Sequence, residues 1–264
     1  MTSIALLVPA FNEAQAMART ALVMREALDA GVVTSATVLD GGSTDGTAEE
    51  ALQCGIRSLH IPSLQPELGP VLGKGDSLYR GVHAVPADWY VFLDADLGNI
   101  CIDHITALTQ HIGEPNVSFI KGGFVRIDEH GEPRDIPAGR VTELVGRPLL
   151  RRAAPQLTYL SQPLFQLTYL SQPLGGQVAI EGNLARSLSF VTGYGIEIAM
   201  LIDVFRLVGA DGIVEADMGT INNRYKPDDA LEDVRDQVLA GAALRIITMP
   251  DYGLVMHGQV TNRD

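Results

Sequence analysis

Short apolar runs alternate with helix-patterned segments along the first hundred residues. Apolar runs predict strands, and apolar residues three or four positions apart predict helices. The predicted strands are 4–9, 37–40, 57–61 and 90–93, and the predicted helices are 13–29, a short one after 47, and 74–85. Because continuously apolar strands are buried on both faces and helices separate them, the pattern predicts an α/β fold with a mostly parallel, doubly covered sheet.

The second half of the chain has a less regular pattern. It predicts strands at 117–125, 177–181 and 213–216, and helices at 139–152, 196–208 and 231–247. No segment has the composition of a linker, so we expect a single domain over 1–264. Within it we expect a first half over about 1–100, a second half over about 101–248 that builds the other wall of a cleft, and a tail over 249–264.

One sequence, Gln-Leu-Thr-Tyr-Leu-Ser-Gln-Pro-Leu, occurs twice in tandem, at 156–164 and again at 166–174. A single pair of copies is no solenoid, because such arrays need several stacked units. One interpretation is a local duplication accommodated as an extra loop or edge strand, since loops tolerate insertions at modest entropic cost. The other is a modified wall or lid of the cleft.

Composition excludes several classes of function. The chain has 264 residues, 46% of them hydrophobic, and a formal net charge of −13. An acidic chain of this kind is not expected to bind nucleic acid or anionic membranes, which recruit basic surfaces. Two cysteines, Cys54 and Cys101, are too few for a disulfide scaffold, and no uncharged apolar run approaches 18 residues. We therefore expect a soluble, cytoplasmic protein without a membrane partner.

Two aspartates, Asp94 and Asp96, follow the predicted strand at 90–93. The carboxyl end of a parallel strand is where an open α/β sheet places its ligands. Aspartates two residues apart point the same way on a strand, so both can approach one hard cation such as Mg²⁺ or Mn²⁺. The alternative is a strand end capped by solvated carboxylates.

Three further polar turns follow predicted strands or precede predicted helices. Residues 9–13 (Pro-Ala-Phe-Asn-Glu) open the first helix, where unpaired N–H groups favour anions, although Asn12 can instead cap that helix. In 40–47, Asp40 is placed to accept hydrogen bonds from a ribose or base; the alternative is a turn with an Asp or Thr cap. In 73–76, Lys74 between two glycines can bring a charge to a diphosphate, but the spacing is not that of a Walker A loop.

The order of these four motifs resembles the GT-A family of nucleotide-sugar glycosyltransferases. Two second-half motifs, 139–150 (beginning Gly-Arg-Val-Thr-Glu-Leu) and 193–198 (Gly-Tyr-Gly-Ile-Glu-Ile), are similar to those of glucosyl-3-phosphoglycerate synthases. The resemblance covers about 4–247. It implies a GT-A fold, with a Rossmann-like, mostly parallel central sheet flanked by helices. In it, about 1–100 bind the nucleotide sugar and the C-terminal half binds the acceptor.

The same resemblance implies a retaining, metal-dependent transfer of glucose from UDP-glucose to the 2-hydroxyl of 3-phosphoglycerate. Asp96 and Glu197 are the implied catalytic residues, and Asp96 with the residue at 223 would hold the metal. The implied donor site comprises Pro9, Ala10, Phe11, Glu13, Asp40, Ser43, Gly73, Lys74, Asp94, Ala95 and Tyr194, and the implied acceptor site comprises Gly139, Arg140, Val141 and Thr142. Both assignments have an alternative. Arg140 can be a solvated residue at the start of a helix, and Glu197 can be a glutamate in the first turn of a helix, where the helix dipole favours it.

The chain departs from the family pattern at several positions. A metal-binding histidine of the family corresponds to Asn223, which lacks the nitrogen ligand that favours softer metals. Two basic residues of the same segment correspond to Ile221 and Lys226, and Gln177 stands where the family often has an acid. We therefore expect weaker metal binding or an altered metal preference.

Several alternatives to this function remain open. The donor can be GDP-mannose or GDP-glucose and the acceptor glycerate. An inverting GT-A enzyme with a lipid phosphate acceptor, a sugar nucleotidyltransferase and a non-catalytic nucleotide-sugar-binding module also use such motifs. No carboxylate is marked as a nucleophile, so retention is expected through front-face attack, with the leaving phosphate accepting the hydroxyl proton. The family likeness further suggests a homodimer.

Overall fold

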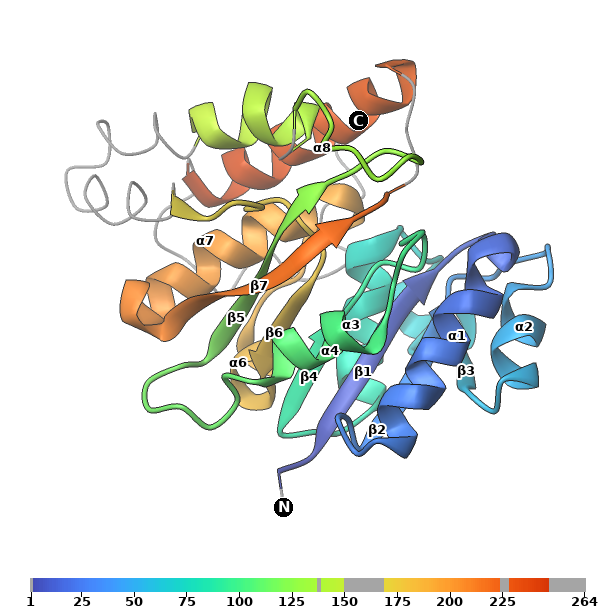
Figure 1. Ribbon diagram of the computed structural model, residues 1–264. Coiled ribbons are helices and arrows are strands. Elements are labelled where there is room, and N and C mark those ends of the chain that lie inside the picture. Colours follow the sequence, from blue (N-terminus) through green and yellow to red (C-terminus); the bar gives the residue numbers. More distant parts are fainter. Residues whose placement is uncertain (1, 137–138, 150–168, 224–227, 247–264) are drawn as a thin grey trace.

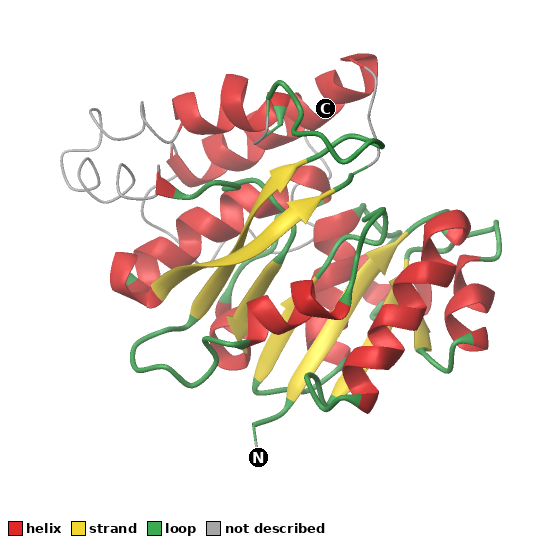
Figure 2. Ribbon diagram, in the orientation of Figure 1, coloured by secondary structure: helices red, strands yellow, loops and turns green. Residues whose placement is uncertain are grey.

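The computed structural model describes residues 2–136, 139–149, 169–223 and 228–246. They form an α/β domain around a seven-stranded sheet in the order β3-β2-β1-β4-β6-β5-β7 (Figures 1 and 2). The strands are β1 (Ile4–Ala10), β2 (Ser35–Asp40), β3 (Arg57–His60), β4 (Trp89–Phe92), β5 (Phe119–Arg126), β6 (Val178–Glu181) and β7 (Ile213–Ile221). Only β6 runs antiparallel to its neighbours, β4 and β5; the other pairs are parallel. The predicted mostly parallel sheet is confirmed.

Helices cover both faces of this sheet. They are α1 (Ala14–Asp29), α2 (Thr47–Gln53), α3 (Lys74–Ala84), α4 (Ile102–Thr109), α6 (Gly182–Ser187), α7 (Ile196–Val208) and α8 (Asp228–Ile246). Shorter helical turns are η1 (Ile61–Ser63), η2 (Pro66–Leu68), η3 (Thr142–Gly146, a π-helix), η5 (Gly193–Gly195) and η6 (Ala210–Gly212).

Alternate strand residues face opposite layers of the core, as the twofold period of a strand requires. Leu7 on β1 belongs to the core layer that contains buried side chains of α3, α6 and α7, whereas its neighbours Leu6 and Val8 belong to the layer that contains those of α1, α2 and α4. Both layers are closed, which explains why the strands are apolar at nearly every position. Since β1, β2 and β4 are parallel, the loops after Ala10, Asp40 and Phe92 meet at one edge of the sheet.

The second half adds β5, β6 and β7 and the layer of α7 and α8 (Figure 1). An ion pair buried between these two helices joins them, with Arg245 Nε 2.6 Å from Asp203 Oδ2. Burial raises the pKa of the Asp203 carboxyl, and Arg245 opposes that effect. This pair holds the carboxyl-terminal end of α8 against the domain.

Most predicted elements are present, with four differences. Helices α4 and α6 were missed, because both are short and α6 also follows β6 directly along the chain. Strand β7 continues past the predicted end at 216 to Ile221, through polar residues at an edge of the sheet. The helix predicted at 139–152 is interrupted by the π-helical turn η3, and 150–152 lie outside the described residues.

No helix in the described part of the chain combines the length and apolarity needed to cross a membrane.

Candidate functional site

The first two donor motifs form interlocked loops after β1 and β2. Asn12 has a positive φ of 54°, and its backbone N–H donates to Ser43 Oγ at 2.9 Å. Its side-chain oxygen accepts from the Thr44 N–H at 2.9 Å, so Asn12 joins the two loops and does not cap α1. Side chains of the second loop do this instead, because Thr47 Oγ1 accepts from the Glu13 N–H and Asp45 Oδ2 accepts from the Ala14 N–H.

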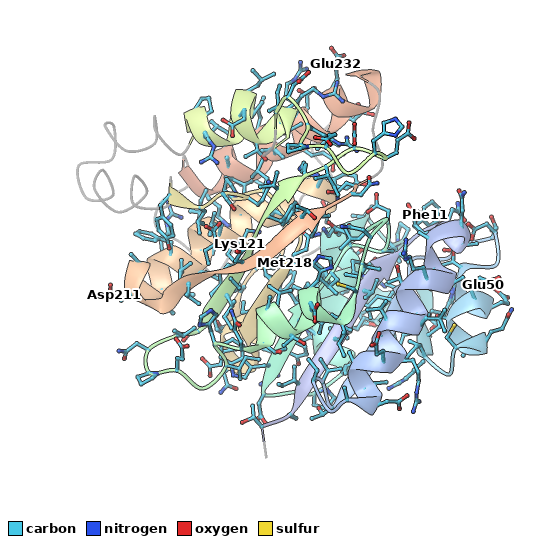
Figure 3. The ribbon with its side chains drawn as sticks, in the orientation of Figure 1. Phe11, Glu50, Lys121, Asp211, Met218 and Glu232 are labelled. Carbon is cyan, nitrogen blue, oxygen red and sulfur yellow. The ribbon has the colours of Figure 1, made fainter. Side chains whose placement is uncertain are left out.

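The other residues of this motif pair take different positions. Pro9 and Ala10 end β1, and Phe11 is 62% exposed beside them (Figure 3). Asp40 is buried, and its Oδ1 accepts from the Ser43 N–H at 2.9 Å. Asp40 therefore shapes its own turn, as the alternative interpretation had it. Its predicted hydrogen bond to a ribose or base stays a prediction.

A partly buried ion cluster joins three segments that are far apart in sequence. Lys74, the first residue of α3, pairs through Nζ with Asp94 Oδ1, and lies 2.7 Å from Glu197 Oε1 in the first turn of α7. Burial alone would lower the pKa of Lys74, but the two carboxylates outweigh it and raise that pKa. Burial likewise acts to raise the pKa of Asp94, yet Lys74 brings it below its ordinary value. Lys74 and Asp94 are therefore both ionised at neutral pH.

Gly176 and Gln177 lie directly against this cluster, a contact that we did not predict from the sequence. Gln177 Nε2 donates to Asp94 Oδ2 at 2.7 Å. A β-carbon on Gly176 would overlap Lys74 Nζ and lie 2.6 Å from Asp94 Oδ1, so a larger residue there would displace the Lys74–Asp94 ion pair. The Gly-Gly pair before Gln177 is the signal that could have indicated a close approach of backbone.

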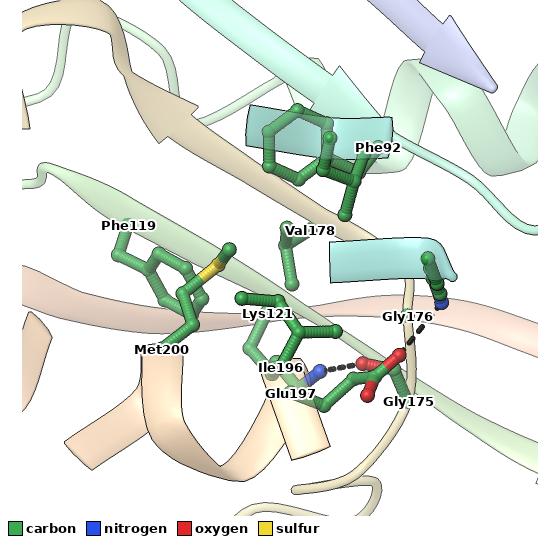
Figure 4. A pocket seen from close by; sticks show the side chains of 11 residues that line it. Phe92, Phe119, Lys121, Gly175, Gly176, Val178, Ile196, Glu197 and Met200 are labelled. Atoms are coloured by element: carbon green, nitrogen blue, oxygen red, sulfur yellow. Dashed lines mark hydrogen bonds and ion pairs between the residues drawn. The ribbon is translucent and has the colours of Figure 1, made fainter. Parts of the chain in front are cut away.

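Lys121, on β5, is a second buried lysine beside the cluster. Its side chain is 1% exposed, and its ammonium group donates to the carbonyl of Gly175 (Figure 4). Burial lowers the pKa of Lys121 to about 8, with Glu197 opposing that effect and Lys74 adding to it. The cavity between Lys121, Glu197 and Met200 measures only about 10 Å³, so this side of the cluster is packed.

Leu97 and Asn223 form an antiparallel bridge, which places Asn223 beside the segment that carries Asp96. Asn223 Oδ1 accepts from Arg126 Nη1 at 2.8 Å, and its carbonyl accepts from Arg134 Nη2 at 2.6 Å. Among the described residues, no three His, Cys, Asp or Glu side chains gather closely enough to hold a metal by themselves. The oxygen donors of Asp96 and Asn223 nevertheless fit a hard cation that takes its other ligands from a diphosphate and water.

The predicted acceptor residues lie beside this pair. Gly139, with φ of 88°, packs against Arg126, since a β-carbon there would be 3.1 Å from Arg126 Nε. Arg140 and Val141 are half-buried at the start of the following helical segment, and Thr142 is buried. Arg126 Nε is itself buried without a hydrogen-bond partner among the described residues. Arg126 and Arg134 were missed, because nothing in the pattern set them apart from other strand-end and loop cations.

The remaining predicted donor residues lie on the three segments that carry the cluster of Lys74, Asp94 and Glu197. Ala95 is buried between the two aspartates, Gly73 precedes α3, and Tyr194, in η5, is 41% exposed. Two departures from the family pattern have structural explanations: Ile221 is a buried core residue and Gln177 bonds to Asp94. Lys226 lies outside the described residues.

The second copy of the duplicated sequence is part of the packed domain. Leu170 is fully buried, Ser171 Oγ donates to Glu215 Oε1 at 2.8 Å, and Gln172 Nε2 donates to the Phe124 carbonyl at 2.8 Å. Residues 169–174 therefore brace β5 and β7. The first copy, 156–164, and residues 166–168 lie outside the described residues.

Known proteins similar to this chain share both its sequence pattern and its fold. Residues 5–159 match the family described as Glycosyl transferase family 2. A glucosyl-3-phosphoglycerate synthase of Mycobacterium tuberculosis is 33% identical over 260 residues, which cover 96% of this chain and 76% of that protein. The corresponding enzyme of Mycolicibacterium smegmatis is 32% identical over 244 residues, covering 90% and 76%.

Solved structures of the Mycobacterium tuberculosis enzyme resemble the present one closely. A complex with Mn²⁺, UDP and glucosyl-3-phosphoglycerate superposes with a TM-score of 0.80 at 32% identity, covering 96% of this chain and 82% of that chain. A complex with Mn²⁺, UDP-glucose and phosphoglyceric acid gives a TM-score of 0.79 at 33% identity with the same coverage.

Proposed function

Because the chain belongs to glycosyl transferase family 2 and, within it, to the glucosyl-3-phosphoglycerate synthases, we propose that it transfers glucose from UDP-glucose to the 2-hydroxyl of 3-phosphoglycerate. The GT-A fold expected from the motifs is confirmed by the similarity to solved structures of this family. The observation that carries the proposal is the cluster in which Lys74 pairs with both Asp94 and Glu197. It lies beside the carboxyl ends of parallel strands, where such a sheet binds nucleotides.

The donor occupies the edge of the sheet formed by about residues 1–100. The interlocked loops at 9–13 and 40–47 present backbone groups and the exposed ring of Phe11 to the uracil and ribose. Their mutual hydrogen bonds fix this surface before the donor arrives, which lowers the entropic cost of binding. Asp94 faces the ribose or the sugar, with Lys74 and Gln177 holding its two oxygens.

Asp96 and Asn223 would hold a divalent cation at the donor diphosphate. The fit rests on their oxygen donors and on the bridge that brings their backbones together. When bound, the cation supplies positive charge that stabilises the leaving UDP. The Asn223 amide oxygen accepts one hydrogen bond from Arg126, so its second lone pair would be the one available to the cation.

The acceptor binds on the second half of the chain, over about 101–248. The turn at Gly139 and the side chains of Arg140 and Thr142 receive its phosphate or carboxylate. Arginine next to a helix start is a sound anion site, because the N–H groups and the guanidinium act together. Arg126, which packs against Gly139, adds positive charge between the acceptor and Asp96.

Transfer with retention proceeds by front-face attack. The bond between C1 of glucose and the diphosphate oxygen breaks, and the acceptor's 2-hydroxyl oxygen bonds to C1 on the same face. The hydroxyl proton passes to the departing phosphate oxygen. Both oxygens of Asp94 accept hydrogen bonds and Glu197 pairs with Lys74, so neither carboxylate is poised as a covalent nucleophile. Their role is to hold the sugar and the acceptor hydroxyl in the geometry that front-face attack requires.

The proposed enzyme is a cytoplasmic homodimer. Two free cysteines, Cys54 and Cys101, agree with a reducing compartment. The dimer rests on likeness to the family, and light scattering on the purified chain tests it: a mass near 28.3 kDa would contradict the dimer.

Release of UDP from UDP-glucose, measured with and without 3-phosphoglycerate and with Mg²⁺ or Mn²⁺, tests the function. Metal-dependent release that requires the acceptor is expected. The variant Asp96→Ala should lose at least about a thousandfold in rate. The matched control, Asp211→Asn at an exposed position in η6, should retain full activity.

Each other outcome points to a different function. Near-wild-type turnover by Asp96→Ala would contradict the metal assignment. Activity only with a GDP-sugar or with glycerate would revise the substrates and keep the enzyme class. Binding of UDP-glucose without turnover for any acceptor and metal would identify a nucleotide-sugar-binding module.

A further inference from the structure

The turn η5 is held between two elements, the start of α3 and the middle of α8. On one side, the Gly193 N–H donates to the Leu72 carbonyl at 3.0 Å. On the other, the Tyr194 N–H donates to Gln237 Oε1 at 2.7 Å. In both hydrogen bonds the donor is a backbone N–H group of the turn.

Glycines allow the backbones of all three elements to touch. A β-carbon on Gly73 would lie 3.1 Å from the Cα of Gly193, and one on Gly195 would lie 2.6 Å from the Gln237 carbonyl. A β-carbon on Gly241 would lie 2.7 Å from the Gly195 carbonyl. No flexible side chain separates these backbones, so a displacement of α8 reaches η5 and α3 directly.

Both halves of the central ion pair extend from this stack. Lys74 follows Gly73, and Glu197 follows Gly195 by two residues; their charged atoms are 2.7 Å apart. The separation of Lys74 and Glu197 is therefore set by how η5 sits between α3 and α8. Gln237 supplies the side-chain hydrogen bond on the α8 side.

We propose that Gln237 is a positioning residue for the transfer reaction: by holding the Tyr194 N–H it fixes η5, and through η5 it fixes Glu197 against Lys74. The proposal rests on the proposed function for its kinetic consequence, but the fixing of the turn can be measured without turnover. Gln237 lies on the α8 side of η5, opposite α3, and it acts on Glu197 only through the backbone of this turn.

Two substitutions separate this role from a general effect on folding. Gln237→Met keeps the size of the side chain and removes the acceptor oxygen, whereas Gln237→Glu keeps an acceptor. Asp236→Asn, at the neighbouring exposed position of α8, is the control and should behave as the wild type.

Steady-state kinetics with UDP-glucose and 3-phosphoglycerate give the first readout. Gln237→Met should lower kcat by about ten- to a hundredfold, because misplacement of reacting groups by an ångström costs on that order. The KM for the acceptor should change little, since the segment at 139–142 does not contain the turn. Gln237→Glu should recover kcat to within about threefold of wild type. Equal impairment of the Met and Glu variants, or unchanged kcat in the Met variant, would overturn the proposal.

Hydrogen exchange of the backbone amides at 193–197 gives the second readout and needs no substrate. Exchange should be faster in Gln237→Met and close to wild type in Gln237→Glu and Asp236→Asn. Unchanged exchange in the Met variant would refute the proposal whatever the activity. An inactive wild type with normal exchange differences would instead count against the proposed substrates and leave the fixing of η5 established.

Discussion

Lys121 provides a direct test of the electrostatics at the centre of this protein. Its side chain is buried on β5 among Phe92, Phe119 and Met200, and its ammonium group donates to the carbonyl of Gly175. A charge in such surroundings is costly unless it is fully compensated. The neighbouring Glu197 carboxylate is already paired with Lys74, so compensation is incomplete. Burial accordingly lowers the pKa of Lys121 from its ordinary 10.5 to about 8.

This pKa change makes folding stability depend on pH in a defined direction. Below about pH 8 Lys121 is protonated in both states, and the folded chain bears the full cost of the buried charge. Between about pH 8 and 10.5 the folded state loses the proton first, so the free energy of unfolding rises with pH. The full shift corresponds to about 3 kcal/mol at roughly 1.4 kcal/mol per pKa unit. Between pH 7 and 9.5 the linkage relation gives a gain of about 2 kcal/mol.

The substitution Lys121→Met removes the titrating group and keeps an unbranched apolar stem. It also removes the hydrogen bond to Gly175, which costs about 1 kcal/mol independently of pH. Urea unfolding of both proteins at pH 7, 8, 9 and 9.5 measures the difference in unfolding free energy. All other groups that titrate in this range are common to both chains, so their contributions cancel.

The expected result is that wild type gains about 2 kcal/mol relative to Lys121→Met between pH 7 and 9.5. A difference that stays constant over this range would show that Lys121 has an ordinary pKa in the folded state. A difference of the opposite sign would show that its carboxylate neighbours outweigh burial. Either result would refute the reasoning.

Three further changes test the site and its surroundings. Gly176→Ala places a methyl group against Lys74 and Asp94, and it should reduce kcat/KM for UDP-glucose by about a hundredfold, measured by UDP release. Unchanged kinetics would show that the glycine is not required. Asn223→His adds a nitrogen ligand and should raise activity with Mn²⁺ relative to Mg²⁺ by on the order of tenfold in a metal titration, whereas an unaltered ratio would exclude residue 223 from the metal site. Deletion of 156–165 leaves one intact copy of the duplicated sequence, so the contacts of Leu170 and Gln172 are kept. The melting temperature and the activity should match those of wild type. A lower melting temperature or a loss of activity would assign a function to the extra copy.

The strand and helix pattern of the first half was predictable because each element carries its own signal. Continuous apolar strands separated by helices admit few arrangements other than a doubly covered parallel sheet. From the parallel order it follows that the loops after β1, β2 and β4 share one edge, and the structure bears this out. Short elements without a separate signal, such as α4 and α6, were missed for the same reason.

Pairings between distant segments were not predictable in this way. The sequence marked Lys74, Asp94 and Glu197 separately, each with a donor-site or catalytic role implied by likeness to the family. That these three side chains form one ion cluster, with Gln177 bonded to Asp94, depends on how α7 and the strand β6 pack against α3 and β4. No local pattern encodes such contacts.

The sequence by itself determined the class of fold, the edge of the sheet that carries the donor motifs, and the family of the protein, because apolar periodicity and short motifs are local properties of the chain. Tertiary structure alone decided which charges are paired and which are buried. It placed Lys121 beside an already paired carboxylate, joined Asn223 to Arg126, and set η5 between α3 and α8. These outcomes depend on distance and exclusion of water, which arise only when segments separated by a hundred residues meet in the folded core.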